Sequence, residues 1–340
     1  MTRDARIRQF LDETGWGAAS RRPLAGDASA RRYERLEAAR GDRAILMDVP
    51  PESGLAIAPF VAVTAWLRAS CFSAPEVMTA DDGAGLALLE DLGDASFAAL
   101  CADDPVHEAD LYTAAIDALA EIHALEPPSP CGDWEPPPYD AALMQREARL
   151  ALEWYAPAVG ATLGKEAVLA FEEALGVALA PALSAPTVPV LRDYHAENLI
   201  WLPCREGSAR VGLLDYQDLL IGPRAYDVVS LLEDARRDVS PDLRRAMAER
   251  YVRTVGLDPA CLEAEASALA AQRNLKILGL FTRLCRRDGK PRYLAMLPRV
   301  WAHLRSDLTH PDLAALRLWV DDHLPPPTSA RLDRIAEAAA

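Results

Sequence analysis

Three oxygen-bearing side chains, Asp193, Asn198 and Asp215, have the residue types and spacing of a divalent-cation site. The stretch NLIWLP begins at Asn198, and RVGLL returns to Asp215 after a polar turn, so a hairpin would place Asn198 and Asp215 at the same end. Asp193 lies in the loop just before it. Mg²⁺ takes a few hard oxygen ligands and completes its shell with water and phosphate oxygens. Phosphoryl transfer also needs a carboxylate near the attacking hydroxyl. The pattern predicts such a site, and the purely structural alternative is two strand-capping Asp residues with a turn Asn.

The elements that must position these residues fall into two groups along the chain. Strand patterns dominate the first hundred residues, and helical periodicity prevails from residue 106 onward, apart from a Pro-rich loop at 126–138. In the first part we expect a short helix within 1–15, three strands within 21–49, a helix over 56–69 and a hairpin over 74–94. In the second part we expect helices over 106–124, 140–154, 164–180, 227–237, 241–255, 260–286, 292–306 and 311–323, and a frayed helix end at the C-terminus.

These elements predict an α+β chain of two lobes. The chain has 340 residues, which is more than one hydrophobic core usually organises. We expect a small antiparallel-sheet N-lobe over residues 1–92 and a larger helical C-lobe over 93–340 that contains one buried hairpin. A cleft between such lobes is a common place for a ligand.

Charge and cysteine usage exclude several classes of protein. The formal net charge of −15 argues against a nucleic-acid surface and against docking on anionic membranes. The first 17 residues lack a secretory pattern, and no apolar run is long enough to span a bilayer. We therefore expect a cytoplasmic protein without nucleic-acid or membrane partners, of undetermined oligomeric state. The six cysteines lack zinc-ligand spacing, and reduced thiols are expected.

The segment R-D-x-H-x-x-N followed by L-L-D-Y-x-D resembles the catalytic segment of the aminoglycoside phosphotransferase and choline kinase superfamily, itself similar to protein kinases. More narrowly, GDASARRY, ALLEDLGD, LRDYHAENLIWL and LLDYQDLLIGPRAYDVVSLLEDARRDV resemble the anomeric N-acetylmuramate and N-acetylglucosamine kinases of peptidoglycan recycling. The resemblance covers nearly the whole chain. It implies a protein-kinase-like two-lobe fold, ATP as co-substrate, Mg²⁺, and phosphorylation of an anomeric sugar hydroxyl. The alternatives are a kinase of another small acceptor, such as an aminoglycoside or amino alcohol, and a non-catalytic nucleotide-binding pseudokinase.

The resemblance also implies roles for individual residues. Asp193 would orient and deprotonate the sugar hydroxyl, while Asn198 and Asp215 would hold Mg²⁺ against the phosphates.

Four neighbouring residues keep two interpretations each. Arg192 would act in the catalytic loop or only stiffen it by pairing with a carboxylate. His195 would contact substrate or only pack the loop, and Asp218 would contact the sugar or lie beside the metal. Asp227 would hydrogen-bond the catalytic loop, cap the helix that follows it, or do both.

Two segments of the N-lobe are expected to bind the nucleotide. Gly26, Ala28 and Ser29 form a small-residue turn between strands, where backbone N–H groups could approach a phosphate. Glu90 and Leu92 lie where an inter-lobe hinge would meet adenine through its backbone. An ordinary hairpin turn and an ordinary polar linker are the structural alternatives.

The third strand departs from the family pattern. It offers Met47 and Asp48 where the family carries a phosphate-binding Lys, and residues 53–70 contain no acidic residue to pair with such a Lys. Positive charge for the phosphates must then come from other residues. The nearest cations are Arg31, Arg32 and Arg43.

The acceptor is expected to meet a basic stripe on the helix over 260–286. Arg273 and Lys276 fall on one face of that helix together with Arg283. The lactyl carboxylate of N-acetylmuramate would suit these cations, whereas salt bridges to surface carboxylates are the structural alternative.

Overall fold

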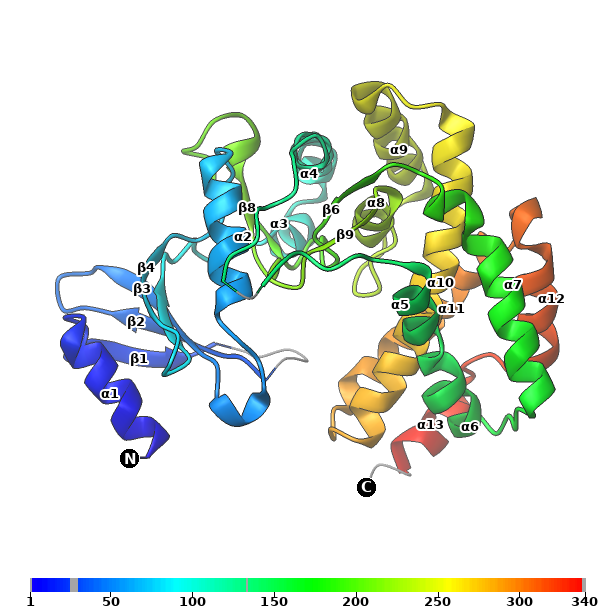
Figure 1. Cartoon of the computed structure of the whole chain (residues 1–340), viewed down its shortest axis with the longest axis horizontal. Helices are drawn as coiled ribbons and strands as arrows, with labels where there is room; N and C mark the ends of the chain where they lie inside the picture. Colours follow the sequence, from blue (N-terminus) through cyan, green and yellow to red (C-terminus); the bar gives the residue numbers. More distant parts are fainter. Residues whose placement is uncertain (1, 25–29, 133, 338–340) are drawn as a thin grey trace. The chain divides into compact units, whose positions relative to one another are not determined.

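The computed structural model describes residues 2–24, 30–132 and 134–337 (Figure 1). The predicted phosphate turn with Gly26, Ala28 and Ser29 lies outside these residues. We therefore place no part of that turn, and its role stays a prediction.

The chain divides into two compact units, which we call the sheet unit and the helical unit. The sheet unit comprises Met1–Ala118, Pro127–Pro136 and Ala196–Leu219, and the helical unit comprises Leu119–Glu126, Pro137–His195 and Leu220–Ala340. The units interleave along the chain, so the predicted lobe boundary between residues 92 and 93 also stays a prediction.

The sheet unit is built on a five-stranded sheet in the order β1-β2-β3-β5-β4, in which every neighbouring pair is antiparallel. Its strands are β1 (Ser20–Pro23), β2 (Arg32–Glu37), β3 (Arg43–Asp48), β4 (Val77–Asp81) and β5 (Leu86–Leu89). This confirms the strands that alternation predicted. Because successive side chains point to opposite faces, the register decides which residues share a face.

One face of the sheet packs against helix α1 (Arg3–Glu13). The helix begins at Thr2, whose Oγ1 accepts a hydrogen bond from the backbone N of Ala5 at 3.3 Å. The apolar side of α1 is buried on alternate residues of the strands. The side chains in this contact include Ile7, Phe10, Leu11, Leu36, Leu46 and Leu88.

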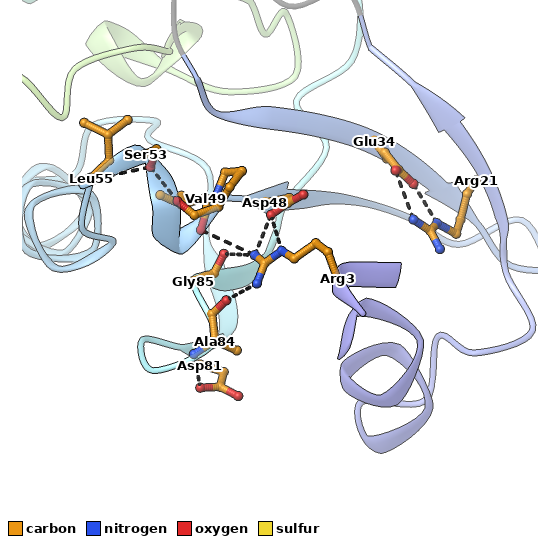
Figure 2. Close-up of polar contacts among 11 residues, drawn as sticks. Arg3, Arg21, Glu34, Asp48, Val49, Ser53, Leu55, Asp81, Ala84 and Gly85 are labelled. Atoms are coloured by element: carbon orange, nitrogen blue, oxygen red, sulfur yellow. Dashed lines mark hydrogen bonds and ion pairs between the residues drawn. The ribbon is translucent and has the colours of Figure 1, made fainter. Parts of the chain in front are cut away.

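Arg3 fixes the start of α1 to the ends of β3 and β5 (Figure 2). Its guanidinium donates to Asp48 Oδ1 at 2.9 Å and to the carbonyl oxygens of Ala84 and Gly85 at 2.5 and 3.0 Å. The Asp48 side chain is only 6% exposed. Asp48, which stands next to Met47 at the altered part of the strand, is therefore the partner of α1.

The hairpin of β7 (Leu199–Trp201) and β8 (Val211–Leu213) confirms the one predicted around the cation ligands. At its open end, Leu214 N donates to Asn198 O at 2.9 Å. A bridge between Ser73 and β8 holds the hairpin within the sheet unit. The pairing therefore brings residues 198 and 214 side by side.

The helical unit gathers around the long helix α10 (Pro259–Arg286). Asp258 begins this helix, because its Oδ1 accepts a hydrogen bond from Ala260 N at 2.8 Å. A Cβ at Gly279 would lie 2.0 Å from the carbonyl carbon of Leu150. Only glycine lets α10 approach that backbone so closely.

Further helices surround these elements in both units, and none among the described residues is long and apolar enough to cross a membrane. They are α2 (Ala58–Ala69), α3 (Phe97–Asp103), α4 (Glu108–His123), α5 (Ala141–Ala148), α6 (Ala156–Ala158), α7 (Lys165–Leu183), α8 (Ala225–Leu232), α9 (Pro241–Val255), α11 (Leu297–Asp307), α12 (Ala314–His323) and α13 (Ser329–Glu337).

Three elements differ from the sequence-based expectation. Strand β6 (Thr187–Val190) pairs with an unpredicted strand, β9 (Leu220–Pro223). The helix expected over 140–154 is interrupted, because residues 151–155 form a π-helical turn just after the contact between Leu150 and α10. Helix α13 was not among the predicted helices, and the residues beyond Glu337, where a frayed helix end was expected, lie outside the described part of the chain.

Candidate active site

A cavity of about 270 Å³ lies on the face of the sheet opposite α1. Side chains from the sheet form its wall, residues 89–93 form one border and the open end of the β7–β8 hairpin forms another. All lining residues belong to the sheet unit. They include Arg31, Tyr33, Ile45, Glu90, Asn198 and Asp215.

Asn198 and Asp215 border this cavity together, as the hairpin prediction required. Asp215 adopts a left-handed backbone conformation with φ of 57°, and Gln217 Nε2 donates to its Oδ1 at 2.6 Å. One carboxylate and one amide oxygen suit Mg²⁺, which usually binds one or two protein carboxylates and fills its shell with water and phosphate oxygens. Among the described residues no three His, Cys, Asp or Glu side chains cluster as a metal cage would need. The residues present therefore fit Mg²⁺.

The segment from Glu90 to Gly93 borders the cavity, and other parts of the sheet unit hold the side chains of Glu90 and Asp91. The Glu90 carboxylate accepts hydrogen bonds from Glu76 N at 3.1 Å and from Arg68 Nη1 at 3.4 Å, and it also pairs with Arg205. Because these contacts occupy the Glu90 side chain, what this segment offers a ligand is its backbone. Leu92 also borders the cavity.

Two buried arginines line the cavity, and one of them is committed to that same segment. Arg35 donates to Asp91 Oδ1 at 3.0 Å and to Asp94 Oδ2 at 2.8 Å. Arg31 is 7% exposed and borders the cavity. Burial raises the pKa of Tyr33, the charge of Asp215 raises it further and the positive charge of Arg31 lowers it. Arg31 and Asp215 therefore both act on Tyr33, and both border the cavity.

The other predicted cations lie elsewhere. Arg32 is exposed and lies opposite Asp48 in the backbone register of β2 and β3. Its side chain is on the other face of the sheet from Tyr33. Arg43 is exposed near Glu37, with 3.9 Å between their charged groups. Met47 is fully buried and lies opposite Tyr33 in the register of β2 and β3, so the two share a face of the sheet. An apolar side chain thus occupies the cavity-side strand position at which a phosphate-binding Lys was expected.

The loop that carries Asp193 belongs to the helical unit, and side chains of α8 hold its backbone by hydrogen bonds. The Asp227 carboxylate accepts hydrogen bonds from Leu191 N at 2.6 Å and Arg192 N at 2.8 Å. Ser230 Oγ donates to the Arg192 carbonyl oxygen at 3.0 Å. Asp227 thus bonds the loop, which confirms one of its interpretations. The other, a cap on α8, is wrong, because Asp227 lies within the first turn of α8 and this helix has no side-chain capping hydrogen bond. Asp193 is exposed on this fixed backbone.

The side chain of Arg192 pairs with a carboxylate, which is the stiffening role foreseen for it. Its partner Glu147 on α5 also binds Lys276 Nζ at 3.0 Å and accepts a hydrogen bond from the Tyr139 hydroxyl at 2.6 Å. Burial acts to raise the pKa of Glu147, but Lys276 and Arg192 outweigh it and leave the pKa lowered. Glu147 is therefore an ionised centre that ties the loop to α5 and α10.

Two of the four predicted substrate contacts, Arg273 and His195, are buried. Arg273 is 5% exposed and donates to Ser230 Oγ at 3.0 Å, so it supports the loop from behind. His195 is 2% exposed, and burial together with the charges of Arg236 and Arg273 lowers its pKa to about 3. Both placements favour a packing role. Asp218 is exposed, and the substrate contacts of all four residues, Lys276 included, stay predictions.

Sequence reasoning missed three polar residues that organise the site. Glu147 lies on the buried face of α5 with Met144 and Ala148, and an acid among apolar helix positions is a signal that it could have used. Arg35 and Gln217 gave no such signal, because what distinguishes them is a contact rather than a spacing.

Comparisons with known proteins identify the family of this chain and its relatives. The model of the phosphotransferase enzyme family matches residues 20–264. The chain is 39% identical to an N-acetylmuramate/N-acetylglucosamine kinase of Caulobacter vibrioides, over 95% of this chain and 97% of that one. It is 33% identical to the protein of that name from Pseudomonas aeruginosa, over 93% and 96% of the two chains.

Solved structures show the same fold at low identity. A choline/ethanolamine kinase family protein from Mesorhizobium loti aligns with a TM-score of 0.59 at 15% identity, covering 99% of this chain and 100% of that one. The amicoumacin kinase hAmiN aligns with a TM-score of 0.62 at 13% identity, covering 92% and 97%. The predicted protein-kinase-like α+β fold is confirmed by these likenesses.

Proposed function

Because the chain belongs to the phosphotransferase enzyme family, we propose that it transfers the γ-phosphoryl group of ATP to the anomeric hydroxyl of N-acetylmuramate or N-acetylglucosamine. Full-length similarity to kinases of that name supports the acceptor. The observation that carries the reaction is one cavity bordered both by the backbone of residues 90–93 and by Asn198 and Asp215. This activity would operate in the cytoplasm, in peptidoglycan recycling.

The sheet unit would hold the nucleotide. Adenine would hydrogen-bond the backbone of Glu90 and Leu92, and the partners of the Glu90 side chain would keep this segment in place. Asn198 and Asp215 would hold Mg²⁺, which neutralises phosphate charge when it is bound. Arg31 would supply the cation that the third strand lacks, since Met47 cannot.

Asp193 would orient the acceptor. Its carboxylate would accept the proton of the anomeric hydroxyl while the new O–P bond forms and the bond to ADP breaks. The loop backbone is fixed at Leu191 and Arg192 by Asp227, so Asp193 keeps one position without paying for ordering during the reaction. Catalysis would rest on this positioning and on charge neutralisation.

A direct assay tests the proposal. The protein is incubated with ATP and MgCl₂ and with N-acetylmuramate, N-acetylglucosamine, choline or kanamycin, and ADP release and the phosphorus NMR spectrum of the product are measured. We expect a sugar 1-phosphate and no reaction with the methyl glycoside of N-acetylglucosamine, which lacks a free anomeric hydroxyl. Turnover of choline or kanamycin without turnover of either sugar would assign a different acceptor. ATP binding without transfer to any of them would indicate a pseudokinase.

A variant tests the role of Asp193. Asp193→Ala should lower kcat at least about 100-fold, because general-base assistance contributes about that much or more, and it should keep the parent's Tm. A well-folded Asp193→Ala protein with the parent's kcat would refute this assignment.

A further inference from the structure

Gln217 lies two residues after the proposed cation ligand Asp215 and is 3% exposed. Its Nε2 donates to Asp215 Oδ1 at 2.6 Å. The chain turns tightly here, because Asp215 has a left-handed φ of 57° and Leu219 N donates to Tyr216 O at 3.1 Å. This turn brings a side chain two positions away back onto the Asp215 carboxylate.

The other polar atom of Gln217 is costly to the fold. Its Oε1 is buried and has no hydrogen-bond partner within the described part of the chain. A buried carbonyl oxygen left unsatisfied costs about 1–3 kcal/mol. An apolar side chain of similar size, such as Met, would fill the same space without that cost. Stability therefore does not account for a glutamine here, but its donated hydrogen bond does.

Tyr216, which lies between Asp215 and Gln217, is held by helix α2. The Tyr216 ring stacks on Phe60 with 5.4 Å between ring centroids, and its hydroxyl lies 2.6 Å from Thr64 Oγ1. The backbone that carries Gln217 is thus anchored, so the amide keeps its place beside Asp215. Residues 60, 64 and 215–217 all belong to the sheet unit.

We propose that Gln217 is a positioning residue that fixes the orientation of the Asp215 carboxylate for Mg²⁺. The terminal torsion of an aspartate is soft, so a donor on one carboxylate oxygen is needed to keep the other oxygen in one direction. The side chain must donate, which Glu or Met cannot do toward a carboxylate. Hydrogen bonds of this kind to metal ligands typically change metal affinity by about 10- to 100-fold. This inference rests on the proposed role of Asp215.

Calorimetry with the non-hydrolysable analogue AMP-PNP tests the inference without any sugar. Affinity for AMP-PNP is measured in EDTA, and affinity for Mg²⁺ is then measured on the protein saturated with AMP-PNP. We expect Gln217→Met to weaken Mg²⁺ binding about tenfold or more and to leave metal-free AMP-PNP binding unchanged. Because no acceptor is present, a wrong sugar assignment cannot affect this result.

Gln272→Met is a matched control. Gln272 is also fully buried, donates from Nε2 to Met144 O at 2.9 Å and has a buried Oε1 without a partner among the described residues. It lies in the helical unit, so its replacement should leave both affinities unchanged. If Gln217→Met does not fold, Gln217→Asn keeps the amide but cannot span the distance, and it should show the same loss. The parent's Mg²⁺ affinity in a folded Gln217 variant, or an equal loss of metal-free AMP-PNP binding, would overturn the proposal.

Discussion

Arg31 and Arg35 both border one cavity, but their surroundings suit different tasks. Arg35 is committed to Asp91 and Asp94 and so holds the segment that would meet adenine. Arg31 shares its electrostatic environment with Asp215 and Tyr33. A kinase whose third strand carries Met47 still needs a cation near the phosphates, and we propose that Arg31 provides it.

Replacing Arg31 should therefore weaken the binding of phosphates specifically. Charge-assisted hydrogen bonds contribute about 1.5–3 kcal/mol, so Arg31→Ala should weaken AMP-PNP binding about 10- to 100-fold. Adenosine binding should not change, because adenosine carries no phosphate. Calorimetry with both ligands measures the difference, and Arg32→Ala on the opposite face is the control. Equal weakening of AMP-PNP and adenosine would mean that Arg31 only shapes the cavity.

His195 gives a pH-dependent prediction at the same scale. Burial, Arg236 and Arg273 lower its pKa to about 3, while Asp234 opposes them. The unfolded chain therefore binds more protons than the folded one between about pH 6.5 and about pH 3. The free energy of unfolding must fall as the pH falls through this window, by at most about 1.4 kcal/mol per pH unit from this residue.

Urea denaturation of His195→Gln between about pH 7 and about pH 4 checks this expectation. The variant should lose less stability than the parent on acidification, because its side chain takes up no proton. His107→Gln is the control, since the His107 side chain is 66% exposed. A parent-like pH slope in His195→Gln would show that His195 does not stay neutral in the folded protein.

At the scale of elements, α1 depends on one guanidinium for its contact with the ends of β3 and β5. Removing it by Arg3→Ala leaves the shielded Asp48 carboxylate and two carbonyl oxygens without their donor. We expect a loss of roughly 2–3 kcal/mol in the free energy of unfolding, measured by urea denaturation. The double variant Arg3→Met with Asp48→Leu should recover most of it, because replacing both partners by apolar groups removes the unpaired charge.

The pair of Arg21 and Glu34 provides the comparison for that prediction (Figure 2). It joins β1 and β2 at 2.6 Å, but both side chains are about a quarter to a third exposed. Arg21→Ala should cost less than about 1 kcal/mol, as exposed ion pairs do. A loss from Arg3→Ala no larger than that from Arg21→Ala would contradict the role assigned to Arg3.

Local patterns predicted most elements, since alternation and helical periodicity act over a few residues. The hairpin at Asn198 and Asp215 was predictable because both strands and their turn lie within 18 residues of sequence. Strand β9 was not, because its four residues pair with β6, about thirty residues earlier, and a short LIGP stretch carries no alternation of its own. The contact of Arg192 with Glu147 spans 45 residues and was equally invisible to spacing.

At the scale of the whole molecule, the residues proposed for catalysis come from both compact units. Asp193 lies in the last helical-unit segment before Ala196, whereas Asn198 and Asp215 lie in the sheet-unit segment that begins there. Every described residue that borders the cavity belongs to the sheet unit. We therefore expect nucleotide binding to act mainly on the sheet unit.

Hydrogen exchange with mass spectrometry can locate this response. With saturating Mg²⁺ and AMP-PNP, we expect slower exchange in residues 86–93 and in the hairpin from 198 to 216, because backbone contacts to a ligand lower local opening. Helix α9 and helix α12 of the helical unit should exchange as before. Adenosine alone should protect residues 86–93 but not the end of the hairpin, since it brings neither phosphates nor a bound cation to Asn198 and Asp215. Protection confined to α9, or equal protection of the hairpin by adenosine, would mean that the cavity does not hold the nucleotide in the orientation proposed.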